Sequence, residues 1–121
     1  RARDLGVPFD GTPGPLNAIT DVAGVTVGHV TLVEDLADGR KLRTGVTVLL
    51  PRGAATLDTP VYGAWSPLNG NGEMTGAAWL EESGQLEGPV VLTNTHSVGV
   101  ARDAVIAWRV RAGGADASGY W

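Results

Sequence analysis

Apolar and polar residues alternate along two stretches in the first half of the chain, with one break in the first of them. The apolar positions are Val25, Val27, Val30 and Leu32 in the first stretch and Val46, Val48 and Leu50 in the second. A period of two is typical of strands that bury one face. Asp38 and Gly39, between the stretches, form a dipeptide that favours hairpin turns. The pattern therefore predicts a β-hairpin that pairs residues 25–33 with residues 43–50.

Turn-forming residues surround this hairpin. Residues 11–21 contain two glycines and two prolines, which predicts an extended, turn-rich lead-in. Residues 61–65 form a short apolar run that ends at Ser66 and Pro67. A short helix is expected next, with Thr75 as its N-cap and Gly84 just beyond its last turn.

A strand and a longer helix are predicted to follow. Residues 90–94 are apolar and β-branched enough for a buried strand, and the pattern then becomes helical. Four apolar residues recur at spacings of three, four and three, which places them on one helix face: Val98, Ala101, Val105 and Trp108. Arg102, Asp103 and Arg109 point elsewhere, and Gly113 and Gly114 end the helix. Residues 111–121 are either a disordered tail or the point at which a longer protein continues.

Composition narrows the classes of protein that this chain can represent. Its 121 residues, 43% of them hydrophobic, allow one domain or part of one. A formal charge of −4 without a basic face argues against nucleic-acid binding. The absence of cysteine removes disulfides and thiolate nucleophiles. No stretch approaches a membrane span, so a soluble protein is expected, either cytoplasmic or periplasmic, and a cleaved leader stays possible.

Metal and cofactor chemistry is not expected. The only histidines, His29 and His96, do not stand in a metal-binding arrangement. His29 lies in the strand pattern and is interpreted as a structural histidine whose hydrogen bonds are satisfied. Residues 70–76 lie between an apolar run and a helix, but they match neither a dinucleotide nor a phosphate loop.

Two polar segments are the candidate site. In the first, residues 69–76, glycines alternate with Asn69, Asn71 and Glu73, which suggests positive φ angles and short polar side chains. The alternative is structural, with asparagines that only shape a tight loop and a solvated glutamate. In either case the loop precedes a helix.

The second segment, residues 93–99, is a junction between a strand and a helix. Such a junction exposes backbone N–H groups that suit a carboxylate or an oxyanion. Asn94, His96 and Ser97 are its candidate members, although Ser97 can equally be a simple N-cap and His96 a surface group. A triad of Ser97, His96 and Asp103 is rejected because adjacent residues point apart and Asp103 lies away from Ser97 along the helix.

Four long stretches carry a family resemblance. They are GTPGPLNAITDVAGVTVGHVTL (11–32), RTGVTVLLPR (43–52), LNGNGEMTGAAWLEESG (68–84) and GPVVLTNTHSVGVARDAVIAW (88–108). Together they resemble the N-terminal region of DmpA-type and β-peptidyl aminopeptidases. Residues 33–42 and 53–60 are expected to be loops outside the resemblance.

The resemblance implies an α/β (α+β) fold, part of a four-layer αββα sandwich similar to the N-terminal-nucleophile hydrolases. Residues 1–121 would be a single partial domain, the N-terminal portion of an α chain. The family's precursor cuts itself before an internal serine, and the free α-amine of that serine then serves as general base for its hydroxyl. No cofactor takes part.

The resemblance also implies partners and a substrate class. The partners are the remainder of the α chain and the β chain that carries the serine, assembled as a homo-oligomer of αβ units. The substrates are short peptides or aminoacyl amides and esters. No catalytic residue is assigned in this chain, and none of Ser66, Ser83, Ser97 and Ser118 is taken as a nucleophile. The alternatives are a non-catalytic scaffold of the same fold and a related acyltransferase.

Overall fold

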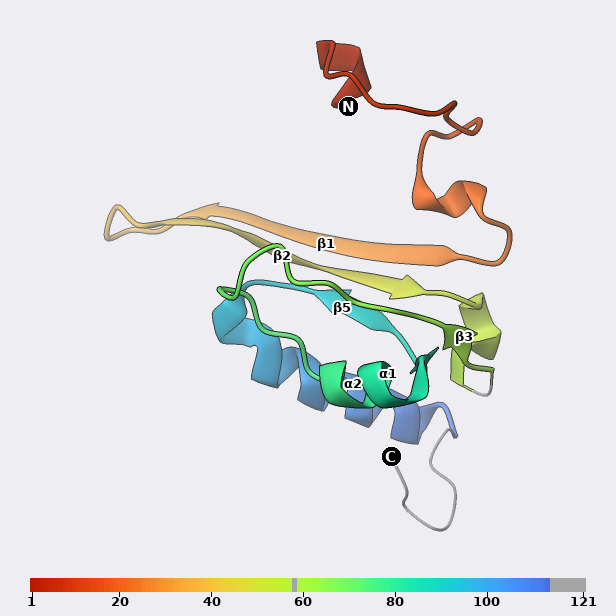
Figure 1. Cartoon of the computed structure of the whole chain (residues 1–121). Coiled ribbons are helices and arrows are strands. Elements are labelled where there is room, and N and C mark those ends of the chain that lie inside the picture. The colour runs from red at the N-terminus through yellow and green to blue at the C-terminus, as the bar shows by residue number, and fades with distance from the viewer. Residues whose placement is uncertain (58, 114–121) are drawn as a thin grey trace.

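A long β-hairpin dominates the computed structural model, which describes residues 1–57 and 59–113 (Figure 1). Strand β1 (Thr26–Asp35) and strand β2 (Lys41–Leu50) form an antiparallel ladder from Thr26↔Leu50 to Asp35↔Lys41. Gly39 adopts a φ of 83° in the turn. The predicted hairpin is confirmed and is longer than expected at its turn end, because residues 34–35 and 41–42 belong to strands and not to a loop.

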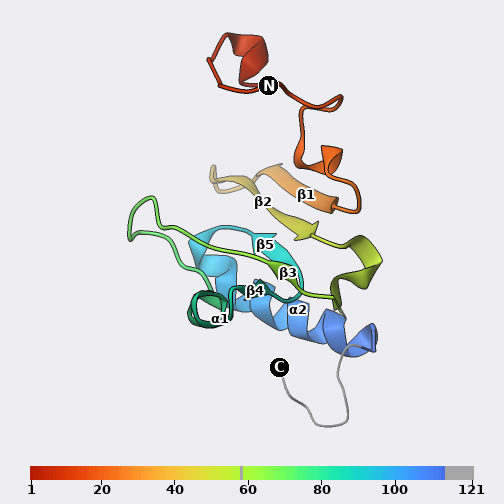
Figure 2. The ribbon, with the colours of Figure 1, turned by 45° about the vertical axis from the view of Figure 1, so that its right-hand side comes forward.

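A third strand joins the hairpin to form a three-stranded sheet, and a helix lies on this sheet. Strand β5 (Val90–Leu92) pairs antiparallel with β2 through Thr47↔Leu92, which gives the strand order β1-β2-β5. Helix α2 (Val98–Arg111) follows and lies along one face of this sheet (Figures 1 and 2). The strand predicted over residues 90–94 is thus confirmed but ends two residues early.

The predicted face of α2 is confirmed. The four residues half-buried there are Val98, Ala101, Val105 and Trp108, whereas Arg102 and Asp103 are exposed. Arg109 is half-buried. The helix ends at Arg111 with Ala112 as its C-cap, and Gly113 follows with a φ of 77°, as a helix stop requires. Gly114 and the rest of the predicted tail lie outside the described residues.

A smaller unit sits beside the main sheet. Strands β3 (Val61–Tyr62) and β4 (Gln85–Leu86) pair antiparallel, with helix α1 (Ala77–Ser83) directly before β4. The predicted N-cap of α1 is wrong by one residue: Gly76, with a φ of 88°, occupies the N-cap position in place of Thr75. Gly84 caps the other end with a φ of 66°, as predicted. Strand β4 was not expected, since two residues carry no periodicity.

Short 3-10 helices join these elements. They are η1 (Arg3–Leu5), η2 (Ile19–Asp21), η3 (Gly53–Leu57) and η4 (Thr95–Ser97). Helix η3 corrects the expectation that residues 53–60 form only a loop. The turn-rich lead-in is confirmed: the Asp21 carboxylate accepts hydrogen bonds from the backbone N–H groups of Leu16 (2.9 Å) and Ala18 (3.2 Å).

Little of this chain is buried. Among the described residues, Leu80 is the one buried large apolar residue, at 6% exposure, and Thr56 is the one buried polar residue. The accessible surface is 9269 Å², whereas a folded monomer of 12.5 kDa exposes about 6,200 Å². All ten residues of β1 are exposed. No described helix is long and apolar enough to cross a membrane.

Candidate functional site

The junction between β5 and α2 is held against β2 by side-chain hydrogen bonds. The Asn94 Nδ2 donates to the Thr44 Oγ1 at 3.2 Å, and the Thr93 Oγ1 donates to the Gly45 carbonyl at 3.3 Å. Both contacts join residues about fifty positions apart in sequence. The strand pairing of β2 with β5 brings them together, which is why no local pattern reveals Thr44 as a partner of Asn94.

The Asn94 side chain also receives a hydrogen bond from Ser97. The Ser97 Oγ donates to the Asn94 Oδ1 at 3.2 Å, and the Ser97 N–H donates to the Asn94 carbonyl at 3.0 Å. Both polar atoms of the Asn94 amide are therefore engaged, so its orientation is fixed. Such an oriented amide can present its second N–H to a carbonyl oxygen or an oxyanion.

Ser97 occupies the N-cap position of α2 but does not cap it with its side chain. Its backbone has φ −102° and ψ 2°, and its hydroxyl makes no hydrogen bond to the first turn of α2. The Ser97 hydroxyl binds Asn94 instead. The amino end of the 14-residue helix α2 is therefore not capped by the side chain at its N-cap position. Free N–H groups at such an end favour negative charge.

His96 and Asp103 do not join Ser97. His96 is exposed in η4 and makes no side-chain hydrogen bond within the described part of the chain. The Asp103 Oδ1 lies 3.7 Å from the Arg102 Nη1, and both side chains are exposed. The structure thus agrees with the rejection of a triad.

The loop before α1 is less ordered by hydrogen bonds. The Asn69 Oδ1 accepts from the Asn71 N–H at 3.0 Å, a local turn that fixes Asn69 and leaves the Asn71 amide exposed. The Glu73 carboxylate is also exposed. The expected positive φ angles are wrong for residues 69–75, because only Gly76 has one in this segment. The glycines there serve a loop of ordinary backbone conformation.

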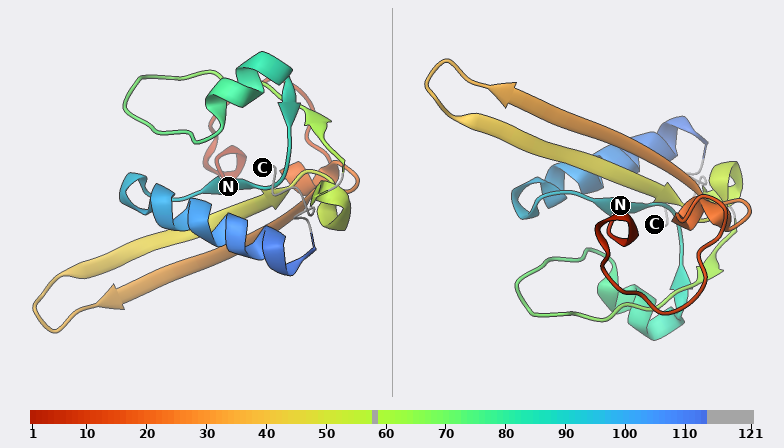
Figure 3. Two further views of the ribbon diagram at one scale, coloured as in Figure 1. Left: turned by 90° about the horizontal axis from the view of Figure 1, so that it is seen from below. Right: turned by 90° about the horizontal axis from the view of Figure 1, so that it is seen from above.

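The two polar segments lie at the same end of the molecule. Figures 1, 2 and 3 all place the loop before α1 near the point where β5 passes into α2. No hydrogen bond joins the two segments in residues 1–57 and 59–113. Asn94 and Ser97 therefore form one connected cluster, whereas Asn71, Glu73 and His96 are neighbours without direct bonds to it.

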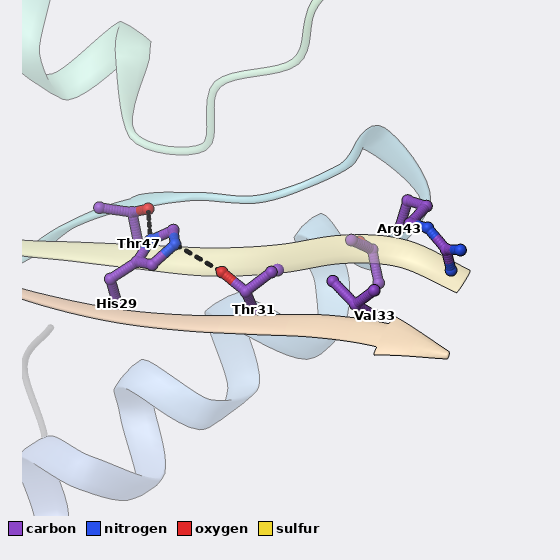
Figure 4. Close-up of a pocket in the computed structure, with 7 residues that line it drawn as sticks. His29, Thr31, Val33, Arg43 and Thr47 are labelled. Atoms are coloured by element: carbon purple, nitrogen blue, oxygen red, sulfur yellow. Dashed lines mark hydrogen bonds between the residues drawn. The ribbon is translucent and has the colours of Figure 1, made fainter. Parts of the chain in front are cut away.

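His29 belongs to a separate polar cluster, on the sheet face opposite to the one that α2 packs against. Its Nδ1 lies 2.7 Å from the Thr47 Oγ1, and its Nε2 lies 2.7 Å from the Thr31 Oγ1 (Figure 4). Both ring nitrogens are engaged, so the interpretation of a satisfied structural histidine is confirmed. Thr31, Thr47 and Arg43 line a shallow hollow of about 450 Å³ there. In the described residues, no group of three metal-binding side chains gathers.

Comparison with known proteins gives a consistent result. A family model described as Peptidase family S58 matches residues 17–120. The β-peptidyl aminopeptidase BapA of Sphingosinicella microcystinivorans is 60% identical over 112 residues, which is 89% of this chain and 28% of that protein. The chain thus spans less than a third of the length of the curated relatives that it matches.

Two solved structures share the fold. A β-aminopeptidase of Burkholderia sp. has a TM-score of 0.85 and 51% identity, and the match covers 100% of this chain and 34% of that chain. The L-aminopeptidase D-Ala-esterase/amidase of Ochrobactrum anthropi, described as a variant of the Ntn hydrolase fold, has a TM-score of 0.81 and 50% identity over 93% of this chain and 32% of its own. The expected fold class is confirmed.

Proposed function

The chain belongs to peptidase family S58, and we propose that it is the N-terminal portion of the α chain of a self-processing serine aminopeptidase. The observation that carries this proposal is the 60% identity to a β-peptidyl aminopeptidase across nearly the whole chain, including both polar segments. The proposed substrates are short peptides and aminoacyl amides or esters, from which the N-terminal residue is released. The proposed assembly is a homo-oligomer of αβ units.

The nucleophile is proposed to lie outside this chain. The Ser97 hydroxyl donates to Asn94, and the Ser83 hydroxyl donates to the Trp79 carbonyl at 2.8 Å. Within residues 1–57 and 59–113, neither hydroxyl is hydrogen-bonded to a base that could take its proton, which a serine nucleophile needs. Ser66 is exposed, and Ser118 is outside the described residues. A β-chain serine with a free α-amine would supply nucleophile and base together, because an α-amine titrates near pH 8.

The Asn94 cluster is proposed to serve the acyl-transfer steps. Attack of the serine on the scissile carbonyl turns its oxygen into an oxyanion, and the acyl-enzyme passes through a second oxyanion when water attacks. The free N–H of the Asn94 amide and the amino end of α2 offer donors of the required kind. Glu73 is proposed to meet the ammonium group of the substrate, with Asn71 and His96 as further contacts and Ser97 holding Asn94 in place.

The test uses the complete gene and its product. Expression of the full-length protein should give an α and a β polypeptide, and these should together hydrolyse aminoacyl p-nitroanilides. Replacement of the new N-terminal serine by alanine should abolish both processing and turnover. A full-length product with neither processing nor turnover would support the scaffold alternative, and transfer of the acyl group mainly to added amines would support an acyltransferase.

A further inference from the structure

The contact between Thr93 and Gly45 lies where the pairing of β2 with β5 ends. The last backbone pair of this ladder on that side is Thr47↔Leu92. One residue further along β5, the Thr93 hydroxyl donates to the Gly45 carbonyl at 3.3 Å. A side chain thus continues the connection between the two strands beyond the last backbone pair. The chain is therefore still held against β2 at the residue directly before Asn94.

Gly45 is held in place by β1, because β2 lies between β1 and β5 (Figure 2). A methyl group on Gly45 would overlap the carbonyl oxygen of Val30 and would lie 3.3 Å from the Thr31 Cα. Both atoms belong to the backbone of β1, which the ladder holds through the pair Thr31↔Gly45. The φ of Gly45 is not positive, so the close approach of β1, and not the backbone conformation, requires glycine here.

The Thr93 contact is better shielded from water than the neighbouring contact of Asn94. Thr93 and Gly45 are both half-buried, whereas Asn94 is exposed and its hydrogen bond to Thr44 is open to solvent. Water competes less for a shielded hydrogen bond, so such a bond holds its geometry better. Two adjacent residues of β2 therefore bind two adjacent residues of the junction, and the bond between Thr93 and Gly45 is the firmer of the two.

We propose that Thr93 and Gly45 are positioning residues for the Asn94 amide. Thr44 and Ser97 set the orientation of this amide. Its location is set by the backbone directly before it, which the Thr93 hydroxyl fixes to β2. Strand β1 in turn fixes Gly45, so the location of the amide follows that of the hairpin. The inference rests on the proposed function, in which the free N–H of Asn94 meets the oxyanion.

A small displacement of the Asn94 amide is enough to lower the rate. A donor stabilises an oxyanion when it lies about 2.7–3.1 Å from the position of that oxygen. A misplacement of about 1 Å can cost up to about a hundredfold in rate. Because the oxyanion forms only during the reaction and not in the bound substrate, the loss should appear in kcat, with little change in KM.

Thr93→Val in the full-length enzyme removes the hydroxyl and keeps the shape of the side chain. It should lower kcat by about tenfold with KM within about twofold of wild type, and Thr93→Ser should restore kcat. Self-cleavage of the precursor passes through the same kind of oxyanion, so its rate should fall in parallel. Thr47→Val is the control and should keep the wild-type kcat, because Thr47 lies on the same strand but bonds His29. An unchanged kcat in Thr93→Val would overturn the proposal.

A double variant distinguishes positioning from a purely structural role. If Thr93 acts through the Asn94 amide, Thr93→Val should change kcat by less than about twofold in an Asn94→Ala background. A purely structural hydroxyl would lower the melting temperature and would lower kcat by the same factor in both backgrounds, and that result would contradict the proposal. Thr93→Ala takes the place of Thr93→Val if the valine variant does not accumulate.

Gly45→Ala tests the contribution of β1. The added methyl group would force the backbones of β1 and β2 apart, so kcat should fall by at least about tenfold, again with little change in KM. Gly28→Ala is the matched control within the same ladder, because a methyl group on Gly28 meets nothing within 4 Å in the described part of the chain. Equal kcat in the two alanine variants would overturn the role of Gly45. If Gly45→Ala does not fold, the Thr93→Val result decides the proposal.

Failure of this inference and failure of the proposed function have different signatures. An active, self-cleaved enzyme whose Thr93→Val variant keeps the wild-type kcat would overturn the inference and leave the aminopeptidase. A parent protein that neither cleaves itself nor hydrolyses aminoacyl p-nitroanilides would overturn both before any variant is made.

Discussion

The two outer strands of the sheet, β1 and β5, are both rich in β-branched residues, yet they have different surroundings. Strand β1 has ten residues and all are exposed, whereas β5 has three residues, of which Val90 and Val91 are half-buried. The difference goes with α2, which packs against β5 and β2, whereas most of the hairpin extends past this helix (Figure 3). Apolar content alone therefore does not decide burial in this sheet; a covering layer does.

The two strands also differ in what holds them in place. Strand β1 is joined to β2 by a short turn, so its ladder forms between residues close in sequence. Strand β5 joins β2 through three residue pairs and through the side chains of Thr93 and Asn94. The β5 side thus combines partial cover with directed polar contacts, and this combination makes it the better site candidate.

The largest expected effect is on the 121-residue chain studied alone. Because β1 is exposed along its whole length, the chain should bind a hydrophobic dye and melt without a sharp cooperative transition, as measured by fluorescence and circular dichroism. It should not hydrolyse aminoacyl p-nitroanilides at all. The full-length enzyme is the control. If the short chain were a monodisperse monomer with a sharp melting transition, the stability of the sheet would not depend on a layer that covers β1.

Asn94→Ala in the full-length enzyme should give the next largest effect. Loss of one donor from an oxyanion-type site lowers kcat or self-cleavage by roughly ten- to a thousandfold. Steady-state kinetics and the rate of α and β chain formation measure it. Thr95→Ala is the neighbouring control and should stay within about twofold of wild type, which is the usual range for a neutral exposed position. A similar result for Asn94→Ala would make the junction purely structural.

Glu73→Gln should change substrate binding more than turnover. Removing the charge that meets the substrate ammonium raises KM by roughly tenfold, the equivalent of about 1.4 kcal/mol, while kcat falls less. The control is Glu87→Gln, since Glu87 is exposed outside both polar segments. A lowered melting temperature with unchanged KM would show that Glu73 only orders its loop.

The smallest expected effects compare two threonines on β2. Thr44→Val removes the partner of the Asn94 Nδ2 and should lower kcat by up to about tenfold, with recovery in Thr44→Ser. Thr47→Val removes the partner of the His29 Nδ1 and should cost at most about 1 kcal/mol of unfolding free energy without changing kcat. If the two valine variants had the same kcat, Thr44 would have no role in the reaction.

The sequence predicted the elements that depend on local pattern. The alternation of Val46, Val48 and Leu50 sufficed for β2, and the spacing of Ala101, Val105 and Trp108 sufficed for the buried face of α2. The turn at Gly39 was predicted equally well from its residue types. These features are set within a few residues, so a single sequence contains the information.

The remaining features depend on contacts between distant segments. Thr44 and Gly45 are ordinary strand residues until the pairing of β2 with β5 places them beside Asn94 and Thr93. Strand β4 exists only because β3 lies opposite. Positive φ angles were expected for Asn69 and Asn71 from their residue types, yet an Asx turn at Asn69 satisfies this loop without them. The residue type at a position determines which φ angles are allowed there, but contacts with other residues determine which of them is adopted.

The hairpin has a consequence for the order of events during synthesis. Its strands are separated by the five residues of the turn, whereas β5 begins at Val90, forty residues after β2 ends at Leu50. A ribosome adds about 5–20 residues each second, and an isolated hairpin forms in about 1–10 μs. The nascent hairpin therefore waits for seconds beside the ribosome before β5 can join it.

During that interval both outer edges of the ladder are free to pair with another chain. Charged residues stand at the tip end of the ladder, where Arg43 binds the Asp35 carboxylate at 2.5 Å and Lys41 lies across from Asp35. Charges on an edge strand discourage such pairing. The apolar stretch from Val27 to Leu32 has no charged residue, so this half of the nascent hairpin lacks that protection.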